Sequence, residues 1–342
     1  MALRAAFTAA LVLQANAVWL AGVNIAGCDI GMNTTGYYDP EDSYGGEYGC
    51  PTSVGPTQMQ HFASKDNFNI FRLPVAWQSL VNNDLVTNEL DATFWAEYDG
   101  IVQACLDTGA YCIVDIHNYA RWWGGIVGQD GPSAADLAKT WSQIATKYAA
   151  QPRIIFGTMN EPHDLDINIW TATLQTVVYA IRDAGATSQM IFLSGSNYAN
   201  AVSFPTDTVG GGPTLSSIVN RDGNTTNLIF ELHQYFDSAG GTQTYCNDAV
   251  AAQIETTGDY LRSIGRQAFM AELGGGNGED CVDIICPVLD VLNDYGDVFV
   301  GWTSWAAGNW WPDYELSEVP DGDADVGIVS SCFAPKFAAG TS

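Results

Sequence analysis

Two glutamates stand near the ends of apolar, strand-like runs of the sequence. Glu161 follows the apolar residues 154–156 and directly precedes Pro162, and Glu272 lies in the run 267–275. Because a proline disfavours helix at the residue before it and cannot donate to a strand ladder, we expect Glu161 at a strand end. Two carboxyl groups across one cleft are what hydrolysis of a glycosidic bond requires. Their separation decides between retention and inversion at the sugar carbon, and the sequence leaves that separation open.

Other polar and aromatic side chains end the remaining apolar runs and are candidates for the same site. They are Arg72, His117, Asn118, Asn160, His233, Tyr235 and Trp305. An arginine beside one carboxyl would keep it ionised, as a nucleophile must be, and Tyr235 could donate a hydrogen bond to the same oxygen. The other carboxyl, in a less cationic setting, could hold a proton near neutral pH and act as acid and then as base.

Glu231 is a third acidic candidate, because it alternates with His233 and Tyr235 along one apolar run. Alternate residues of a strand face the same side, which here is the side of the candidate site. Glu231 comes earlier in the run than Tyr235, so we expect it to lie deeper, as a buried member of a polar network.

Several of the 11 tryptophans follow the ends of apolar runs. An indole ring is a flat apolar surface on which the C–H face of a sugar can stack. The tryptophans in such positions are Trp122, Trp123, Trp305, Trp310 and Trp311, and the candidate sugar platforms chosen from them are Trp122, Trp305, Trp310 and Trp311. The tryptophans that we expect in the core, because they lie on strand or helix faces, are Trp19, Trp95, Trp141 and Trp170.

The elements that must position these residues are apolar runs alternating with helix-like stretches. The runs lie at 18–27, 68–75, 111–118, 153–162, 190–197, 227–236, 267–275 and 298–308. The helix-like stretches lie at 92–109, 134–150, 168–185 and 248–265. This alternation predicts an α/β protein with a (β/α)₈ barrel fold, in which the carboxyl ends of all strands meet at one mouth. A doubly wound open sheet is the alternative, and it is disfavoured because no G-x-G-x-x-G follows the first run.

The ends of the chain and its cysteines bear on compartment and domain count. Residues 1–17 carry Arg4, an apolar run and a closing Ala-Asn-Ala, which predicts a secretory signal peptide; the alternative is an ordinary N-terminal helix. Nothing in 18–342 is typical of a linker, so we expect one domain there. The eight cysteines and the sequons at Asn33 and Asn224 are typical of a secreted glycoprotein. The sequence leaves the disulfide pairing open, although a local Cys105–Cys112 bridge is plausible.

The composition limits the possible partners. The formal net charge is −27, which argues against nucleic acid or an anionic membrane as a partner, and we expect a monomer. No metal site or cofactor is predicted, because the four histidines lack metal-ligand spacing. The acidic stretch 321–325 resembles the start of a calcium loop, but Val326 and Cys332 occupy positions where such a loop needs glycine and glutamate, so we expect a solvated acidic loop.

Six motifs together resemble glycoside hydrolase family 5, and in detail its fungal-type secreted endo-β-1,4-glucanases. They are "FRLPV", "DIHNY", "MNEPHD", "HQYFD", "AELGG" and "WTSWAAG", which occur in this order, and the opening "GVNIAGCDIG" is similar to that subgroup. The resemblance covers the chain from about Val18 onward. It implies a retaining double displacement on a (β/α)₈ barrel, acting on cellulose or on soluble or amorphous β-glucan.

The resemblance also implies roles for individual residues. Glu161 would be the acid/base, Glu272 the nucleophile, Asn160 the ligand of the sugar 2-hydroxyl and Trp305 the platform at the cleavage site. The residues that would position the charges are Arg72, His117, Asn118, His233 and Tyr235. The disulfides that it implies are Cys28–Cys50, Cys105–Cys112, Cys246–Cys281 and Cys286–Cys332.

Two alternatives remain open. The same machinery could act on mannan or xyloglucan, since loops away from the cleavage site decide the backbone. A non-catalytic sugar-binding protein on this scaffold is the other alternative, and the pair Glu161 and Glu272 with Arg72 argues against it.

Overall fold

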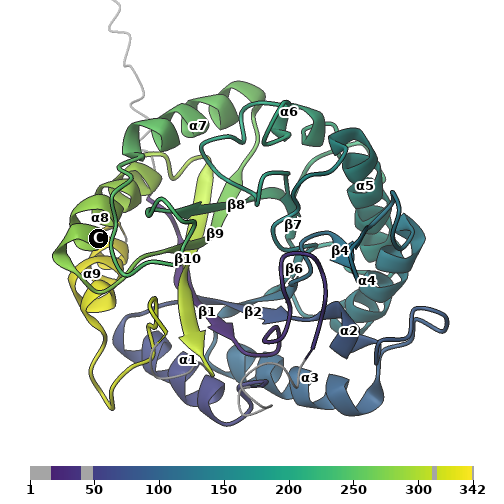
Figure 1. Ribbon diagram of the computed structural model, residues 1–342, viewed down its shortest axis with the longest axis horizontal. Helices are drawn as coiled ribbons and strands as arrows, with labels where there is room; N and C mark the ends of the chain where they lie inside the picture. Colours follow the sequence, from purple (N-terminus) through teal and green to yellow (C-terminus); the bar gives the residue numbers. More distant parts are fainter. Residues whose placement is uncertain (1–16, 40–48, 310–313, 341–342) are drawn as a thin grey trace, which may run out of the picture.

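The computed structural model describes residues 17–39, 49–309 and 314–340, and its centre is a closed barrel of parallel strands (Figure 1). Around the barrel the strands follow the order β1-β10-β9-β8-β7-β6-β3-β2. Their bounds are β1 Leu20–Ala26, β2 Ile70–Val75, β3 Tyr111–Ile116, β6 Ile154–Gly157, β7 Ile191–Ser194, β8 Leu228–Tyr235, β9 Ala268–Gly274 and β10 Phe299–Gly308. Each strand lies within a run that the sequence predicted, so the predicted (β/α)₈ fold is confirmed.

Helices surround the barrel on its outer side (Figure 1). The four predicted helices are α3 Ala92–Asp107, α4 Ala134–Tyr148, α5 Ile167–Asp183 and α7 Ala251–Ile264. The elements that the sequence did not single out are α1 Val54–Lys65, α2 Trp77–Leu80, α6 Gly212–Leu215, α8 Glu279–Asp294, α9 Ala334–Gly340, a π-helical turn Val329–Phe333 and the hairpin of β4 Arg121–Trp122 with β5 Gly125–Ile126.

Polar side chains cap several of these helices. The carboxylate of Asp91 accepts hydrogen bonds from backbone N–H groups in the first turn of α3, and Asp166 does the same for α5. At the start of α4, Ser133 and Asp136 form a reciprocal capping box. Such caps satisfy backbone donors that have no partner inside the helix, and each stabilises by about 1 kcal/mol.

Side-chain alternation inside the barrel separates an apolar layer from a charged one. Near the amino ends of the strands, the inward side chains form one apolar cluster: Leu20, Ile70, Ile113, Ile155, Phe192, Ile229, Phe269, Ala271 and Val300. Two residues further along three of these strands come Arg72, Asp115 and Glu231, all fully buried. Because strand side chains alternate with a period of two, these charges face the same interior, one layer nearer the carboxyl ends. The apolar cluster is therefore the floor of the polar mouth.

A β-bulge in β9 turns Glu272 into the barrel. Ala271 faces the interior with the apolar cluster, so regular alternation would point Glu272 outwards. The pairing between β8 and β9 instead shifts register just before Glu272, and an extra residue of this kind re-aims the side chains that follow it. The carbonyl oxygen of Ala271 accepts hydrogen bonds from Asn24 Nδ2 at 2.9 Å and Thr303 Oγ1 at 2.6 Å.

A second apolar layer lies between the barrel and the helices. Trp141 and Trp170 are buried in it as predicted, and Trp95 packs against it. The prediction for Trp19 is wrong, because this residue precedes β1 and its side chain is 44% exposed. Its ring packs edge-on against that of Tyr111, the first residue of β3, with centroids 5.4 Å apart.

Four disulfides cross-link the described part of the chain, three of them between segments more than 20 residues apart. They are Cys28–Cys50, Cys105–Cys112, Cys246–Cys281 and Cys286–Cys332, the pairs that the family resemblance implies. The sequon residues Asn33 and Asn224 are both exposed, and their glycosylation stays a prediction. Within the described ranges, no helix has the length and apolar character needed to span a membrane. The predicted signal peptide lies almost entirely outside the described residues.

Candidate active site

The Glu272 carboxylate is held by a cation and a phenol at the mouth of the barrel. Arg72 Nη1 donates to Glu272 Oε1 at 2.6 Å, and the Tyr235 hydroxyl donates to Oε2 at 2.7 Å. The sequence analysis expected both partners on one oxygen, whereas the structure gives each oxygen its own donor. Gly241, at φ 90°, lies against the Tyr235 ring, where an added Cβ would come within 2.5 Å of Tyr235 Cδ1. A glycine is therefore needed there to hold this ring in place.

Arg72 is the hub of the buried charges. Besides Glu272, its guanidinium lies 3.0 Å from Glu231 and 3.1 Å from Asp115, and its side chain is fully buried. Burial alone would lower the pKa of Arg72, but the nearby carboxylates hold it above its usual range. The same guanidinium donates to Asn24 Oδ1 at 3.0 Å and to Asn160 Oδ1 at 2.8 Å. Glu231 is thus the buried network member that the sequence analysis expected.

His117 and Asn160 form a chain of hydrogen bonds that ends on Asp115. Burial lowers the pKa of His117 to about 4, so its imidazole is neutral at neutral pH. Asn160 Nδ2 lies 3.2 Å from His117 Nε2, and His117 Nδ1 lies 2.9 Å from Asp115 Oδ2. In a neutral ring, Nε2 then accepts from Asn160 and the Nδ1–H group donates to Asp115. Burial raises the pKa of Asp115 well above its usual range, and repulsion from the neighbouring carboxylates Glu231 and Glu272 acts in the same direction.

Glu161 faces Glu272 across the mouth and is bound by His233. His233 Nδ1 lies 2.8 Å from Glu161 Oε1 and 3.5 Å from Glu272 Oε2. Burial opposes the charged form of His233, but the carboxylates around it raise its pKa to about 10, so it is a cation. Glu161 therefore has a cationic neighbour, contrary to our expectation of a less cationic setting. The backbone at Glu161 has φ 41°, a left-handed conformation beyond the end of β6 that directs the side chain into the mouth.

The two glutamates are close together. One oxygen of Glu161, one oxygen of Glu272 and one ring nitrogen of His233 all lie within 4.8 Å of one another. Retaining glycosidases have carboxyl groups about 5–5.5 Å apart, and inverting enzymes have about 6.5–9.5 Å. The observed spacing fits the closer class. The same three groups could also coordinate a metal ion, but the positive charge on His233 opposes a divalent cation there.

Trp305 forms one wall of the mouth. Its ring stacks on His117 with centroids 5.4 Å apart and 14° between the planes, and its Nε1–H donates to the Tyr314 hydroxyl at 2.6 Å. Trp310 and Trp311 lie outside the described residues. Trp122 packs edge-on against Trp77 at 5.1 Å and is half-buried against the core, and its role as a sugar platform stays a prediction.

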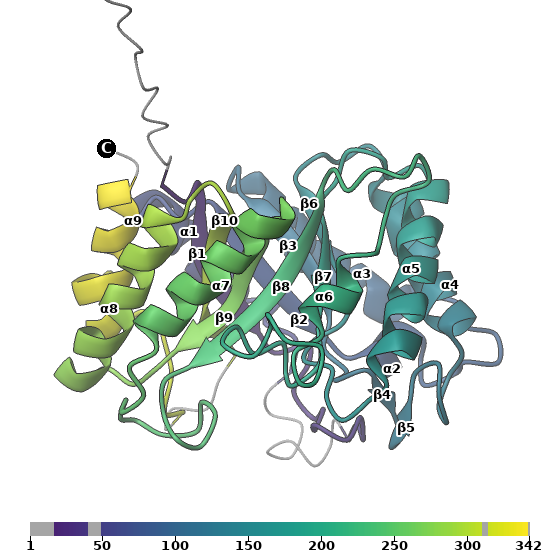
Figure 2. The same ribbon diagram turned by 90° about the horizontal axis from the view of Figure 1, so that it is seen from above.

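Trp123 is better placed than its neighbour Trp122 to stack against a sugar, because more of its ring is exposed. It is 39% exposed and lines a cavity of about 660 Å³ beside the carboxyl ends of β1 and β2, together with Tyr38 and Phe94. Its Nε1–H donates to Asn83 Oδ1 at 2.8 Å, which fixes the ring. Trp123 lies in the turn between β4 and β5, and this hairpin lies on the side of the molecule towards which the β8 arrow points (Figure 2).

Asn118 is not brought to the charged groups. Its Oδ1 accepts from the backbone N–H of Trp77 at 2.7 Å, and its Nδ2 donates to Gln78 Oε1 at 2.7 Å and to the Arg121 carbonyl at 3.2 Å. Asn118 therefore joins the loops that follow β2 and β3, and it supports the site from behind.

Two buried residues and one half-buried residue of the site had no role assigned from the sequence. Asp115 precedes His117 by two residues in an apolar run, and a charge at that position was a signal that it faces the interior. Asn24, in "GVNIAG", carried the same kind of signal. Tyr314, which binds Trp305, lies in a loop, and no sequence pattern indicated it.

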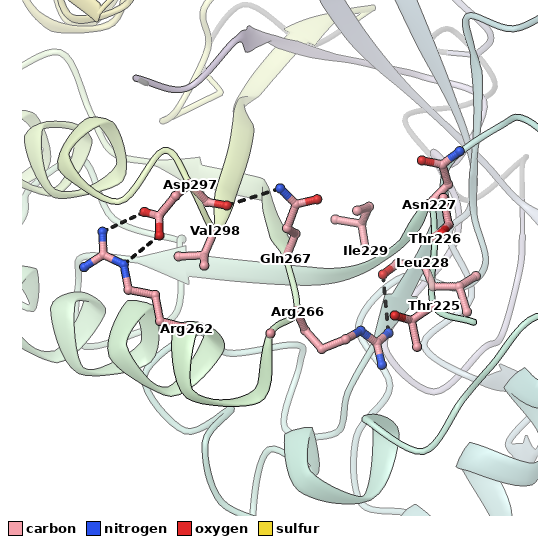
Figure 3. Close-up of a pocket in the computed structure, with 11 residues that line it drawn as sticks. Thr225, Thr226, Asn227, Leu228, Ile229, Arg262, Arg266, Gln267, Asp297 and Val298 are labelled. Atoms are coloured by element: carbon pink, nitrogen blue, oxygen red, sulfur yellow. Dashed lines mark hydrogen bonds and ion pairs between the residues drawn. The ribbon is translucent and has the colours of Figure 1, made fainter. Parts of the chain in front are cut away.

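Another cavity opens at the opposite end of the barrel, at the amino ends of β8, β9 and β10 (Figure 3). Its volume is about 710 Å³. Its carboxylate, Asp297, accepts two hydrogen bonds from Arg262 at 2.6 and 2.8 Å, and Arg266 donates to the backbone carbonyls of Ser216 and Leu228. The charged groups of this cavity are thus engaged in structural contacts. Its lining contains one carboxylate, whereas the mouth has a close pair.

A parallel (β/α)₈ barrel with two close glutamates and a buried arginine at its carboxyl end has the architecture of a glycoside hydrolase. Comparison with known proteins agrees. The family described as "Cellulase (glycosyl hydrolase family 5)" matches residues 23–308. The chain belongs to this family, which confirms both the predicted resemblance and the predicted enzyme class.

Individual relatives are similar over nearly the whole chain. The chain is 48% identical over 331 residues to endoglucanase EG-II of Hypocrea jecorina, covering 93% of this chain and 78% of that protein. It is 40% identical over 321 residues to endoglucanase 1 of Saitozyma flava, covering 93% and 90%. The crystal structure of Cel5A (EG2) from Hypocrea jecorina superimposes with a TM-score of 0.86 at 47% identity, covering 94% of this chain and 99% of that one.

A buried glutamate next to the site gives a prediction for stability. Glu318 is 1% exposed and accepts a hydrogen bond from Ser304 Oγ at 2.5 Å, one residue before Trp305. Burial raises the pKa of Glu318 to about 8 from 4.5. Between these pH values the folded chain holds a proton on Glu318 that the unfolded chain releases. The contribution of protonated Glu318 to the free energy of unfolding is therefore complete below about pH 4.5 and is lost as the pH rises through 8.

We expect the stability of Glu318→Gln to be independent of this titration, because an amide has the shape of the protonated acid and cannot lose a proton. Urea unfolding at pH 5 and at pH 8.5 should show that the wild type loses about 3–4 kcal/mol more than the variant over this interval. Glu315→Gln, at an exposed position in the same loop, is the matched control and should keep the wild-type slope. Equal slopes for the wild type and Glu318→Gln would contradict the prediction.

Proposed function

We propose that this protein is a secreted, retaining endo-β-1,4-glucanase that acts on soluble or amorphous β-glucan. The observation that carries the proposal is the close pair of glutamates, in which Glu272 is bound by Arg72 and Tyr235 while Glu161 is bound by His233. The relatives named above are endoglucanases, and the family is described as cellulase. The predicted signal peptide and the four disulfides support secretion.

The reaction would proceed in two displacements. In the first, a Glu272 oxygen bonds to the anomeric carbon while the glycosidic bond breaks, and Glu161 gives its proton to the leaving oxygen. In the second, Glu161 takes a proton from water, the water oxygen bonds to the anomeric carbon, and Glu272 is released. Arg72 and Tyr235 hold the nucleophile in line, and His233 orients the acid/base.

Two further residues would bind the sugar at the cleavage site. Asn160 uses one amide N–H towards His117, and its other N–H is the donor for the sugar 2-hydroxyl. Trp305, fixed by Tyr314 and His117, would stack under the sugar ring. Trp123, on the rim, would meet a sugar farther from the reacting bond, since its ring is exposed beside a cavity.

Reducing-sugar release from carboxymethyl cellulose, mannan and xyloglucan tests the substrate. We expect carboxymethyl cellulose to be cleaved by the wild type and not by Glu272→Ala. If wild type and variant are equally inert on all three polymers, the hydrolase proposal fails. If mannan or xyloglucan is cleaved and carboxymethyl cellulose is not, only the substrate assignment fails.

The stereochemistry is tested separately by following the anomeric protons of early products by NMR. Two displacements at one carbon retain its configuration, so the first product formed should be the β-anomer. Formation of the α-anomer first would mean a single displacement by water and would exclude a covalent intermediate on Glu272.

A further inference from the structure

A cluster of metal-ligating side chains lies away from the mouth, where α1 ends against the loop that follows β10. His61 is in the last turns of α1, Asp66 caps its carboxyl end, and Asp325 comes from the loop. One donor atom from each of the three residues lies within 4.8 Å of the other two. His61 Nε2 and Asp325 Oδ1 are 2.6 Å apart. The cluster thus joins segments that are about 260 residues apart in the chain.

Asp66 gives a separate reason to look for a ligand. It is 7% exposed, and its Oδ2 has no hydrogen-bond partner among the residues that the structure describes. A buried carboxylate oxygen without a partner is costly, because it has left water without a replacement interaction. Asp66 also lies close enough to Asp325 for the two carboxylates to repel each other. A cation between them would remove both costs.

We propose that His61, Asp66 and Asp325 bind a divalent first-row transition-metal cation of the Zn²⁺ or Mn²⁺ kind. One imidazole nitrogen and two carboxylate oxygens are a ligand set that such ions accept, with water completing the coordination. Ligand bonds of about 2.0–2.2 Å place neighbouring donors roughly 3.4 Å apart in a tetrahedral site. The separations here, 2.6 Å and up to 4.8 Å, bracket that value. The metal would take the place of the proton between His61 and Asp325.

The ligand chemistry differs from that of the calcium loop that the sequence suggested. Calcium prefers six to eight oxygens, and the loop pattern would have used Asp321, Asp323 and Asp325 together. In the structure Asp321 and Asp323 are exposed, and only Asp325 turns towards α1. The helix supplies the other two ligands, which no spacing within the loop could reveal.

Lys65 is the competing cation. Its ammonium group lies 3.1 Å from Asp325 Oδ2, and its side chain is 42% exposed, so it can turn outwards into water when a metal binds. Without a metal, the Lys65 ammonium group balances part of the negative charge of Asp325. This arrangement predicts that removing the lysine charge strengthens metal binding, which a purely structural ion pair would not do.

Metal binding would anchor the loop after β10 to α1, and this loop supports one wall of the mouth. The same loop carries Tyr314, which binds Trp305, and Glu318, which binds Ser304. A cation that joins Asp325 to α1 would restrict the movement of the loop in the unbound enzyme. This effect is independent of the reaction proposed above.

Isothermal titration calorimetry of the EDTA-treated protein with ZnCl₂, and in parallel with MnCl₂, tests the proposal. We expect one equivalent to bind, and the midpoint of thermal unfolding to rise by about 4 °C when the free metal is 100 times the Kd. Asp66→Asn should weaken binding by at least about tenfold, because it removes a ligand charge and keeps the shape. Lys65→Gln should bind roughly fourfold more tightly.

Two controls locate the ion. Asp323→Asn removes an exposed charge from the same loop and should bind metal almost as the wild type does. Glu161→Gln should leave the stoichiometry unchanged, since the mouth contains the other group of possible ligands. The proposal is overturned if neither ZnCl₂ nor MnCl₂ binds at millimolar concentration, if CaCl₂ alone binds, or if Asp66→Asn binds as the wild type does. Loss of binding in Glu161→Gln would also overturn it.

Discussion

Replacing Glu272 with alanine is expected to lower kcat by at least about 10⁴-fold, because the variant lacks the group that forms the bond to the sugar. The fold should persist, since Arg72 keeps Asp115 and Glu231 as partners at 3.1 and 3.0 Å. The measurement is hydrolysis of an aryl β-cellobioside, with circular dichroism and thermal unfolding as checks on the fold. A loss of activity smaller than about 10²-fold would contradict the role of Glu272 as nucleophile.

Azide separates the roles of the two glutamates. In Glu272→Ala, azide can occupy the space of the missing carboxylate and attack the anomeric carbon directly, so the expected product is the α-glycosyl azide. In Glu161→Ala, azide would instead attack the intermediate on Glu272, so the expected product is the β-glycosyl azide. The two variants are matched, because each lacks one carboxyl of the same pair. If the two configurations are exchanged, the roles assigned to the two glutamates are also exchanged.

Replacing Arg72 with methionine is expected to lower the stability by about 3–5 kcal/mol and kcat by about 10³-fold. The variant has similar volume but leaves three carboxylates, Asp115, Glu231 and Glu272, without the guanidinium that now lies 2.6 to 3.1 Å from them. The loss of stability comes from buried carboxylates that no longer have a cationic partner, and not from a cavity. Urea unfolding at neutral pH and kinetics on the aryl β-cellobioside measure the two effects.

The matched control for Arg72 is Arg221→Met. Arg221 also pairs with a carboxylate, Asp183, but both side chains are more than half exposed. Because water screens the attraction within such a pair, we expect only a small loss of stability in Arg221→Met and no change in kcat. A second check is the double variant Arg72→Met with Asp115→Asn, which should recover part of the lost stability. If Arg72→Met is as stable as Arg221→Met, the account of Arg72 as the hub of buried charge is wrong.

The strands and the layer of charges could be predicted because their signals are local. The apolar runs marked all eight barrel strands, and the period of two along 227–236 placed Glu231, His233 and Tyr235 on one face, as found. What the sequence left undecided depends on tertiary contacts. Trp122 and Trp123 are adjacent and have the same chemistry, and the packing of Trp122 against Trp77 distinguishes the half-buried ring from the exposed one. Likewise, nothing in the residue type of Asn118 shows that its amide oxygen accepts from the backbone N–H of Trp77 at the start of α2.

The sequence by itself determined the barrel and the class of chemistry, because hydrophobic periodicity and residue type are properties of short segments. Only the tertiary structure decided which way Glu272 points and what charges surround Glu161. Glu272 faces the mouth because β9 bulges against β8, and Glu161 meets the His233 cation because two strands converge there. The cluster of His61, Asp66 and Asp325 has the same origin, since a helix end and a distant loop meet only after the barrel has closed. The direction of a side chain and the charges around it depend on strand register and on closure of the barrel, which are set by contacts between residues far apart in the chain.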